Sequence, residues 1–172
     1  GIASVVATSA EGREAEVGIV GRDGMLDVAT IMGAEFSPLR SFIQIAGSGF
    51  RISTRTLRQS QLASPTLQAQ LGRYAYDYLL QVAQTALANA SFTVEQRLAR
   101  WLLMCADRTE EEEIVLTHEF LSVMLNVRRA GVTVAIQSLE RSGLVKAHRG
   151  SILIVDRAGL TKVAQDAYTP CS

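Results

Sequence analysis

The sequence has few of the residues that disulfide scaffolds and metal sites require. Its 172 residues include two cysteines and two histidines, and Cys105, Cys171, His118 and His148 are scattered without zinc-ligand spacing. So few cysteines argue against a disulfide scaffold and fit the reducing cytoplasm. We therefore expect a cytoplasmic protein with no metal ion and no other cofactor.

Long apolar runs and an excess of one charge are also missing. Without a run of about 18 apolar residues, no membrane-spanning helix is expected, and residues 1–10 lack the basic start of a secretory signal. The chain has 17 positive and 17 negative residues, which argues against the simplest polyanion-binding proteins, although charge can still gather locally. The composition is that of a folded, soluble protein with one large or two small domains.

Residues typical of catalysis are missing as well. We find neither a nucleophile–base pair nor a carboxylate dyad suited to a pocket, and Asp23 and Asp27 are interpreted as members of one turn. The spacing Gly18-x-x-Gly21-x-x-Gly24 is not followed by the Gly-Lys-Ser/Thr of a phosphate-binding loop, so these glycines are predicted to form turns. The sequence does not predict an enzyme.

The first 58 residues are rich in glycine and β-branched residues. Three runs of strand length, Ile2–Thr8, Glu14–Val20 and Ser41–Ala46, lie between turn signals. We predict short antiparallel strands in a roll or barrel over residues 1–58.

A long, almost uncharged helix is predicted next. Ser64 supplies a capping hydroxyl, Pro65 suits the first turn, and no glycine or proline follows Gly72 up to about Asn89. Such a helix is about 37 Å long, and residues 59–92 hold one positive and one negative residue. It needs cover on more than one face, so it either crosses a core or pairs with a copy of itself. We favour a dimerisation helix over residues 59–92, because a small roll covers only one face.

A helical pattern resumes at Thr93-x-x-Gln96, which is a capping-box sequence. Apolar residues then follow one helical face from Val94 to Cys105, so the Cys105 thiol is predicted to be buried and structural. The acidic run Glu110–Glu113 is interpreted as a solvated loop.

The most informative pattern predicts two short helices joined by a tight turn. Thr117 can cap the first helix, Asn126 tolerates the left-handed backbone of a turn, and the second helix runs from about Arg128 to Arg141. The inward-facing positions are Phe120, Leu121, Met124, Leu125, Val132, Ile136 and Leu139, and the outward-facing positions of the second helix are Arg129, Thr133, Gln137 and Glu140. This is a helix-turn-helix pattern, in which the N-terminal end of the second helix meets base edges in the major groove.

A hairpin is predicted after these helices. The β-rich runs Leu144–Ala147 and Ser151–Val155 flank His148-Arg149-Gly150, as in the wing of a winged helix. Between Asn126 and Gly150 the sequence has five positive residues and one negative residue. The local charge is therefore +4, and phosphates attract such a patch. Each arginine alone is interpreted as a solvated surface residue, but together with the turn and the wing they favour DNA binding.

These residues resemble the DNA-binding domain of the Crp/Fnr family of bacterial transcription regulators. Thr93–Leu103 is similar to the family's helix entering that domain, and Gly143–Gly150 to its route into the wing. The resemblance implies an α+β fold: a partial antiparallel β-roll of the cyclic-nucleotide-binding type, a long dimerisation helix, and a winged helix-turn-helix over residues 93–172. Family chains hold more strands ahead of the position of Gly1, so we expect the chain to lack the first part of the roll.

The resemblance also implies which residues contact DNA. Arg129 keeps the family's first arginine, but Ala130 stands in place of a glutamate and Val134 in place of a second arginine, so the family's usual operator is not expected. Arg129 suits guanine, while Thr133 and Gln137 read or position neighbouring bases. The DNA-binding set comprises Thr117, His118, Arg128, Arg129, Thr133, Gln137, His148 and Arg149. Thr117, His118, His148 and Arg149 are assigned to the phosphate backbone, although an ordinary surface role stays open for both histidines.

The effector site departs from the family pattern. Cyclic-nucleotide binders pair a Gly-Glu on the ribose with an Arg-Ser or Arg-Thr on the cyclic phosphate, whereas here Gly24 precedes Met25 and Arg40-Ser41 resembles the second pair. Gly24, Arg40 and Ser41 are the candidate effector residues, and an ordinary surface role stays open for Arg40. The missing carboxylate removes a charge-assisted hydrogen bond of about 1.5–3 kcal/mol, so cyclic AMP is not the expected effector.

The sequence therefore predicts a homodimeric, sequence-specific transcription regulator on a pseudo-palindromic operator, modulated by a small molecule other than cyclic AMP. The expected partners are double-stranded DNA and a second copy of the chain, with RNA polymerase as a candidate partner and no membrane. The alternative is a ligand-sensing module whose winged helix mediates protein–protein contact.

Overall fold

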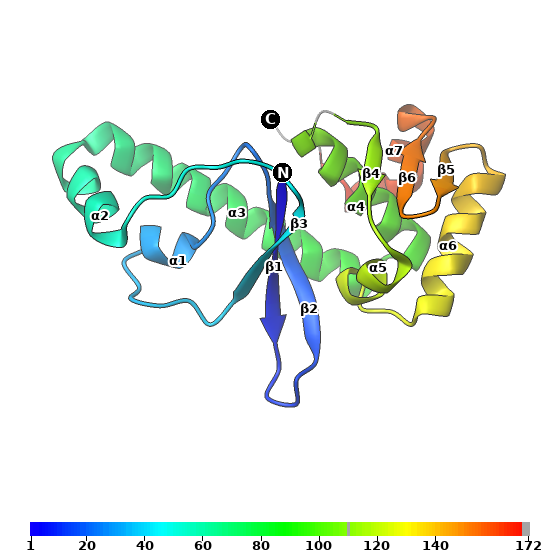
Figure 1. The fold of residues 1–172 in the computed structure, drawn as a ribbon, viewed down its shortest axis with the longest axis horizontal. Coiled ribbons are helices and arrows are strands. Elements are labelled where there is room, and N and C mark those ends of the chain that lie inside the picture. Colours follow the sequence, from blue (N-terminus) through cyan, green and yellow to red (C-terminus); the bar gives the residue numbers. More distant parts are fainter. Residues whose placement is uncertain (110, 170–172) are drawn as a thin grey trace.

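The computed structural model describes residues 1–109 and 111–169, and it contains two small antiparallel sheets and two long helices, the longer of which runs along most of the molecule (Figure 1). Antiparallel strands combined with helices give the predicted α+β fold. The expectations for Glu110 and Cys171 lie outside the described residues.

The first sheet is built from the three predicted strands. β1 (Ile2–Thr8) lies in the middle, with β2 (Glu14–Val20) and β3 (Arg40–Ile45) antiparallel on its two sides. Between β2 and β3 the chain forms a glycine-rich loop and the short helix α1 (Val28–Ile31). Asp23 and Asp27 serve this loop, because Asp23 accepts a hydrogen bond from the Gly21 amide and Asp27 one from the Thr30 hydroxyl.

Two helices follow, where the sequence predicts one. α2 (Thr54–Ala63) begins at Ser53, whose hydroxyl accepts a hydrogen bond from the Thr56 amide. α2 thus spans the expected division between residues 1–58 and 59–92. The extended backbone of Ser64 separates it from α3 (Pro65–Ser91), and the Ser64 hydroxyl caps α3 as predicted.

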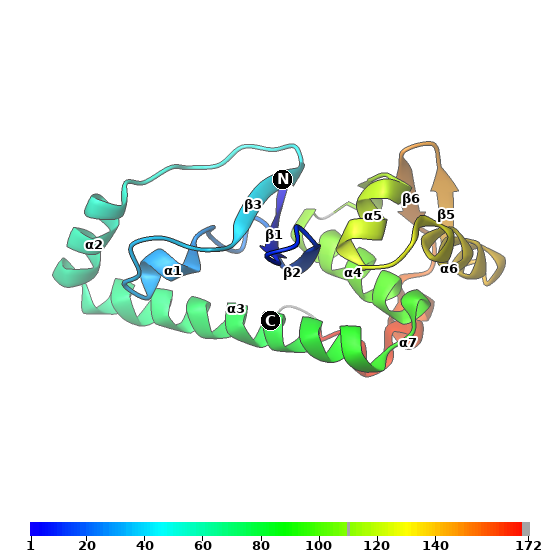
Figure 2. The same cartoon turned by 90° about the horizontal axis from the view of Figure 1, so that it is seen from below.

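α3 is covered on one side by the first sheet and α1 (Figure 2). The Gln81 amide bonds both the backbone N–H and C=O of Ile19 in β2, and the Tyr74 hydroxyl donates to the Met25 carbonyl. Tyr78 is buried between these contacts. The opposite side of the helix is exposed over its whole length, so α3 does not cross a core.

The C-terminal half is organised around α4 (Val94–Thr109). The predicted capping box at its start forms in both directions, since Thr93 and Gln96 exchange backbone-to-side-chain hydrogen bonds. Apart from its ends, α4 is buried on nearly all sides, and burial raises the pKa of the Cys105 thiol well above its ordinary value. α7 (Arg157–Ala164) and the short helix η1 (Gln165–Ala167) pack on it.

A second sheet completes this half, with the strand order β4-β6-β5. β4 (Glu113–Val115) pairs antiparallel with β6 (Ser151–Ile154), and β5 (Val145–His148) lies on the other side of β6. The interpretation of Glu113 as part of a solvated loop is therefore wrong. Its backbone enters the sheet because Ile114 is buried beneath it, while the Glu113 carboxylate stays exposed and accepts a hydrogen bond from Ser151.

One continuous core joins the two halves of the chain. Ile2, Val6 and Ile19 of the first sheet belong to the same buried cluster as Leu98 and Leu102 of α4. The side chains that bridge the halves are an edge-to-face series of rings in which Phe120 contacts both Phe42 and Trp101. The first sheet is thus packed directly against the helices that follow α3.

A carboxylic acid is buried at this junction. Glu16 of β2 is 6% exposed, and its Oε1 accepts a 2.8 Å hydrogen bond from the Trp101 indole of α4. Its other carboxylate oxygen has no hydrogen-bond partner among the described residues. Burial raises the pKa of Glu16 from its ordinary value of 4.5 to about 7, opposed by the hydrogen bond from Trp101 and by the charges of Arg100 and Arg108.

This raised pKa predicts a pH-dependent stability. Between about pH 4.5 and 7 the folded chain holds a proton on Glu16 that the unfolded chain releases, so the free energy of unfolding falls as the pH rises through this window and levels off above it. In Glu16→Gln the amide cannot titrate. Between pH 4.5 and 8 the free energy of unfolding of the wild type should therefore fall relative to that of the variant, by up to about 3 kcal/mol.

Urea unfolding of both proteins across this pH range measures that difference directly. Subtracting the two profiles removes the other carboxylates, which they share. A difference that stays constant with pH would show that Glu16 titrates near its ordinary value in the fold.

Candidate nucleic-acid interface

α5 (His118–Met124) and α6 (Arg129–Arg141) form a helix-turn-helix at the end of the molecule opposite α2 (Figures 1 and 2). The Thr117 hydroxyl caps α5 by accepting a hydrogen bond from the Phe120 amide. Asn126 takes the left-handed backbone conformation predicted for the turn, with φ of 48°.

The two helices are held together by the apolar positions that the sequence assigns to the inside. Val132 and Leu139 of α6 are fully buried, as is Leu121 of α5, and Phe120 is packed against the same core. α6 is therefore fixed in rotation, and one of its faces is turned to the solvent.

That exposed face is not centred where the sequence predicts. The exposed row consists of Ala130, Val134, Gln137 and Arg141, together with Arg128 and Arg129 at the N-terminal end. The outer-face pattern left out Ala130 and Val134, because a pattern that assigns polar residues to the outside passes over an apolar residue in the solvent. The family resemblance did place both at positions where relatives carry charged residues, and helical spacing from the buried Val132 and Leu139 agrees with their outward position.

Two polar residues assigned to the outer face are partly buried and bonded within the protein. The Thr133 hydroxyl lies 3.3 Å from His118 Nδ1 and 3.2 Å from the Arg129 carbonyl oxygen, which ties α6 to the start of α5. The Glu140 carboxylate accepts a 2.8 Å hydrogen bond from the Ala147 amide, which ties α6 to β5. Both side chains hold the orientation of α6.

The predicted wing is the hairpin of β5 and β6. His148 pairs with Ser151, so the turn consists of Arg149 and Gly150 alone, and Gly150 takes a φ of +92° that favours glycine. The hairpin lies next to α6 (Figure 2). Both His148 and Arg149 are exposed at its tip.

Positive charge gathers on this part of the surface. Within the described parts of the chain, none of its five cations takes part in an ion pair, and all of them are exposed: Arg128, Arg129, Arg141, Lys146 and Arg149. The one acid between them, Glu140, is engaged with the backbone of β5. The local charge of +4 therefore faces the solvent, as binding to a polyanion requires.

The eight predicted DNA-binding residues fall into two groups along this surface. Thr117 and His118 at the start of α5 adjoin α6 through the contact of His118 with Thr133. The remaining members lie along α6 and at the tip of the wing: Arg128, Arg129, Thr133, Gln137, His148 and Arg149. The Thr117 hydroxyl is occupied as a helix cap, which leaves its exposed surface for a further contact.

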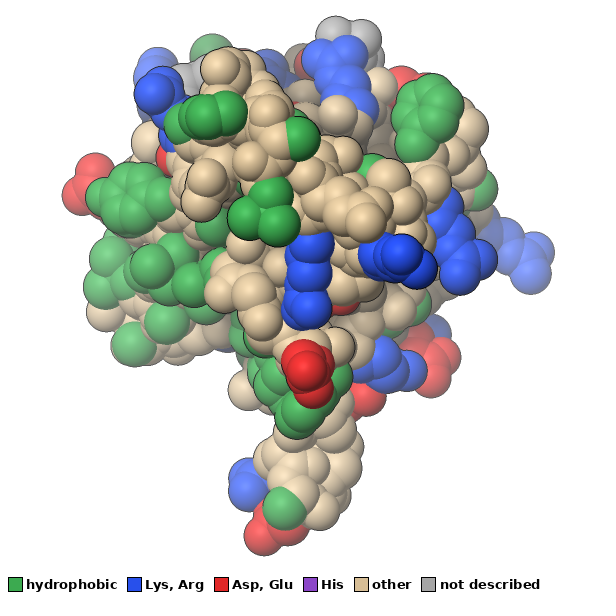
Figure 3. All heavy atoms as spheres, turned by 90° about the vertical axis from the view of Figure 1, so that its left-hand side faces the viewer, with side chains coloured by type: hydrophobic (Ala, Val, Ile, Leu, Met, Phe, Trp, Pro, Cys, Tyr) green, Lys and Arg blue, Asp and Glu red, His purple; other side chains and the backbone are tan. Residues whose placement is uncertain are grey.

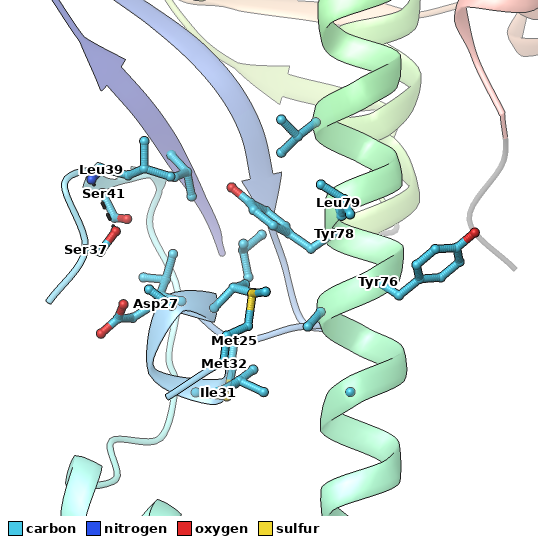
Figure 4. Close-up of a pocket in the computed structure, with 18 of the residues that line it drawn as sticks. Met25, Asp27, Ile31, Met32, Ser37, Leu39, Ser41, Tyr76, Tyr78 and Leu79 are labelled. Carbon is cyan, nitrogen blue, oxygen red and sulfur yellow. Dashed lines mark hydrogen bonds between the residues drawn. The ribbon is translucent and has the colours of Figure 1, made fainter. Parts of the chain in front are cut away.

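A second site is a cavity of about 1190 Å³ between the first sheet, α1 and α3 (Figure 4). Tyr78 points from α3 across it toward the strands, Met25 and Ile31 face it from the other side, and Tyr76 points away. Figure 3 views the molecule from the end that carries α2 and shows hydrophobic side chains gathered on part of this surface. Met32 lines the cavity and is 75% exposed. The segments between α1 and the end of α2 carry further exposed large hydrophobic residues: Phe36, Phe50 and Leu62.

The three candidate effector residues do not converge on this cavity. Among the described residues, Ser41 lies in its wall, whereas Gly24 and Arg40 do not. The Arg40 guanidinium forms a 2.7 Å ion pair with Glu14 and lies over the Phe42 ring. A Cβ at Gly24 would lie 2.5 Å from the Tyr74 hydroxyl, so this glycine allows the loop to approach α3 closely.

No helix in the described ranges 1–109 and 111–169 is long and apolar enough to cross a membrane. Within those ranges no group of three or more His, Cys, Asp or Glu side chains could hold a metal ion.

Comparison with known proteins agrees with this geometry. Residues 96–163 match the Crp-like helix-turn-helix domain, and no curated protein gives a significant match by sequence. A Crp/Fnr-family transcriptional regulator from Eubacterium rectale has a similar structure, with a TM-score of 0.72 and 20% identity over 95% of this chain and 77% of that one. A CRP-family regulator from Thermus thermophilus matches with a TM-score of 0.72 and 17% identity, over 99% of this chain and 87% of that one. FixK2 from Bradyrhizobium japonicum matches with a TM-score of 0.68 and 14% identity, over 100% of this chain and 85% of that one.

The matched domain contains most of α4, the helix-turn-helix and the wing, and the structural likeness extends over the first sheet and α3. Residues 96–163 thus form a Crp-like helix-turn-helix domain, and the chain as a whole has the fold of the Crp/Fnr transcriptional regulators.

Proposed function

We propose that this chain is a sequence-specific, DNA-binding transcription regulator that acts as a homodimer on a pseudo-palindromic operator. The observation that carries the proposal is the exposed face of α6, which together with the adjoining wing carries five solvent-facing cations within a Crp-like domain. Arginines in such numbers neutralise phosphates, and a helix presented in this way fits the major groove.

The proposed contacts follow from the position of each side chain. Arg129, exposed in the first turn of α6, reads guanine, and Gln137 two turns later reads a neighbouring base. His118, Arg128, His148 and Arg149, with the exposed surface of Thr117, contact the phosphate backbone on either side. Thr133 acts by positioning, because its hydroxyl is bonded to His118 and to the backbone of α6.

Arg129→Ala should lower specific binding while leaving non-specific binding largely intact. The loss expected for one base-reading arginine is about 1–3 kcal/mol, or a five- to 150-fold weaker Kd for the selected operator. Arg149→Ala is the matched variant at the wing. It should weaken binding to all sequences alike and reduce the dependence of binding on salt.

Operator sequences for this test come from selection on random duplex DNA, and affinities are measured by fluorescence anisotropy at two salt concentrations. Unchanged specific affinity in Arg129→Ala would show that another residue reads the operator.

The exposed side of α3 supports the dimer. Positions spaced by four and three residues along it are all exposed and mostly apolar: Ala69, Arg73, Tyr76, Leu80, Ala83, Leu87 and Ala90. We call this set the α3 seam. Its spacing is the heptad spacing of paired helices. A second copy of α3 would cover it, and two recognition helices would then meet successive major grooves about 34 Å apart.

Two charged substitutions in the α3 seam should prevent the chain from forming a dimer. Leu80 and Leu87 are 45% and 48% exposed in the single chain, and Leu80→Arg combined with Leu87→Arg places like charges against each other across the seam. Light scattering coupled to gel filtration should give the dimer mass for the wild type and the monomer mass for the variant.

The control for this experiment is Leu62→Arg, at a leucine of α2 that is 87% exposed and outside the seam. It should remain dimeric. A wild-type monomer at micromolar concentration, or a dimeric double variant, would contradict the proposed interface.

We further propose three functional parts: an effector-type region at residues 1–58, a dimerisation region at residues 59–92, and the DNA-binding domain at residues 93–172. The cavity beside α3 is the proposed effector site. Apolar residues such as Met25, Leu26 and Val82 make up most of its wall, and no lysine or arginine is among the described residues that line it. Met25 and the ion-paired Arg40 support an effector other than cyclic AMP.

Cyclic AMP should therefore leave the protein unchanged. Because no described residue of the lining offers a cation for the phosphate, millimolar cyclic AMP is expected to raise the Tm by less than about 1 °C, which corresponds to a Kd above the concentration used. Differential scanning fluorimetry measures this shift, with AMP as the control for non-specific effects. A dose-dependent rise with cyclic AMP alone would place a cyclic nucleotide in the site.

The second candidate is a ligand-sensing module whose winged helix binds a protein. It is less well supported, because five solvent-facing cations on one helix and its adjoining wing suit phosphates better than a mixed protein surface. Binding to random-sequence duplex that weakens steeply with salt separates DNA binding from this alternative.

A further inference from the structure

An apolar side chain stands in the middle of the face that we assign to DNA. Val134 is 62% exposed, whereas the other large hydrophobic residues of α6, all of them described, are buried. It lies one turn after Ala130 and just under one turn before Gln137, both of which are exposed. Its side chain faces the solvent, although Val132 and Ile136 on either side in sequence are buried.

The rotation of α6 makes this exposure a fixed feature. The contacts of Thr133 with His118 and of Glu140 with the Ala147 amide hold the helix from both sides of the exposed row. The buried Leu139 fixes it from beneath. Val134 therefore cannot turn inward without breaking these contacts.

The surroundings of Val134 define the kind of surface it meets. Arg128 and Arg129 lie at the N-terminal end of the same face, and Arg141 at the other. A partner that satisfies these cations and also covers a valine must present an apolar group between two lines of negative charge. The major groove of DNA has this arrangement, because the C5-methyl of thymine is the apolar group on its floor and phosphates run along both edges.

We propose that Val134 is a specificity-determining residue that reads the C5-methyl group of a thymine in each half-site. The inference rests on the proposed DNA-binding function and adds to it a base preference at one position. Ala130, one turn earlier, extends the apolar surface along the same row. The helix then specifies bases by two different means: hydrogen bonds from Arg129 and Gln137, and methyl burial at Val134.

Replacing thymine by deoxyuridine tests this directly, because it removes the methyl group and leaves every hydrogen-bonding group in place. After an operator has been selected with the wild-type chain, each thymine of one half-site is replaced in turn. One position should show about fourfold weaker binding, equivalent to about 0.8 kcal/mol for one buried methyl group.

The same duplexes are then measured with Val134→Ala, which shortens the side chain and raises helix propensity. At the sensitive position this variant should bind thymine and deoxyuridine duplexes equally. Val115→Ala is the matched control, since Val115 is 63% exposed on β4 outside α6. It should keep the fourfold difference.

Each outcome has one meaning. A position whose thymine preference disappears in Val134→Ala and persists in Val115→Ala establishes the contact. An operator without any methyl-sensitive thymine, or a sensitivity that persists in Val134→Ala, overturns the inference while leaving DNA binding intact. If the wild type selects no sequence at all, the proposed function itself fails and this inference fails with it.

Discussion

The packing of the first sheet against α4 and α5 is the constraint on which the rest of the structure depends. α4 is a helix that needs cover on nearly every side, and the sheet supplies one of those sides through Ile2, Val6 and Ile19. The Glu16–Trp101 hydrogen bond and the contact of Phe42 with Phe120 lie at the same junction. The sheet, α3 and the helix-turn-helix are therefore packed against one another rather than joined only by linkers.

Arginines fix the angle between the two long helices. Arg100 of α4 donates to the Thr85 hydroxyl of α3, and Arg97 donates both to Asn89 of α3 and to the Leu125 carbonyl in the turn before α6. Arg97 thus connects the end of the long helix to the turn that orients the recognition helix. A ligand that reorients the DNA-binding helices must favour a state in which these bonds differ, because only differential affinity shifts such an equilibrium.

The sequence predicted most of this architecture wherever a local rule was strong. The strands β1 and β2 follow from β-branched runs between glycines, and Ser64, Thr93 and Thr117 all act as the predicted caps. α2 was missed because it holds few apolar residues and buries one of them, Leu57.

The candidate site was predicted less completely than the fold. Whether Thr133 and Glu140 face the solvent depends on His118 and on the β5 backbone, which lie elsewhere in the chain. Likewise Arg40 is held by Glu14 across the first sheet, a pairing that no local motif reveals. Side chains whose partners are distant in sequence are the ones that a local pattern misplaces.

The composition of α6 has a consequence for how recognition is maintained. Gly131 and the β-branched Val132, Thr133, Val134 and Ile136 have weak intrinsic helix propensity, so this segment would be largely unfolded as an isolated peptide. Its helical state exists because the core beneath it is intact. A substitution that loosens that core would therefore weaken recognition even when every DNA-facing side chain is kept.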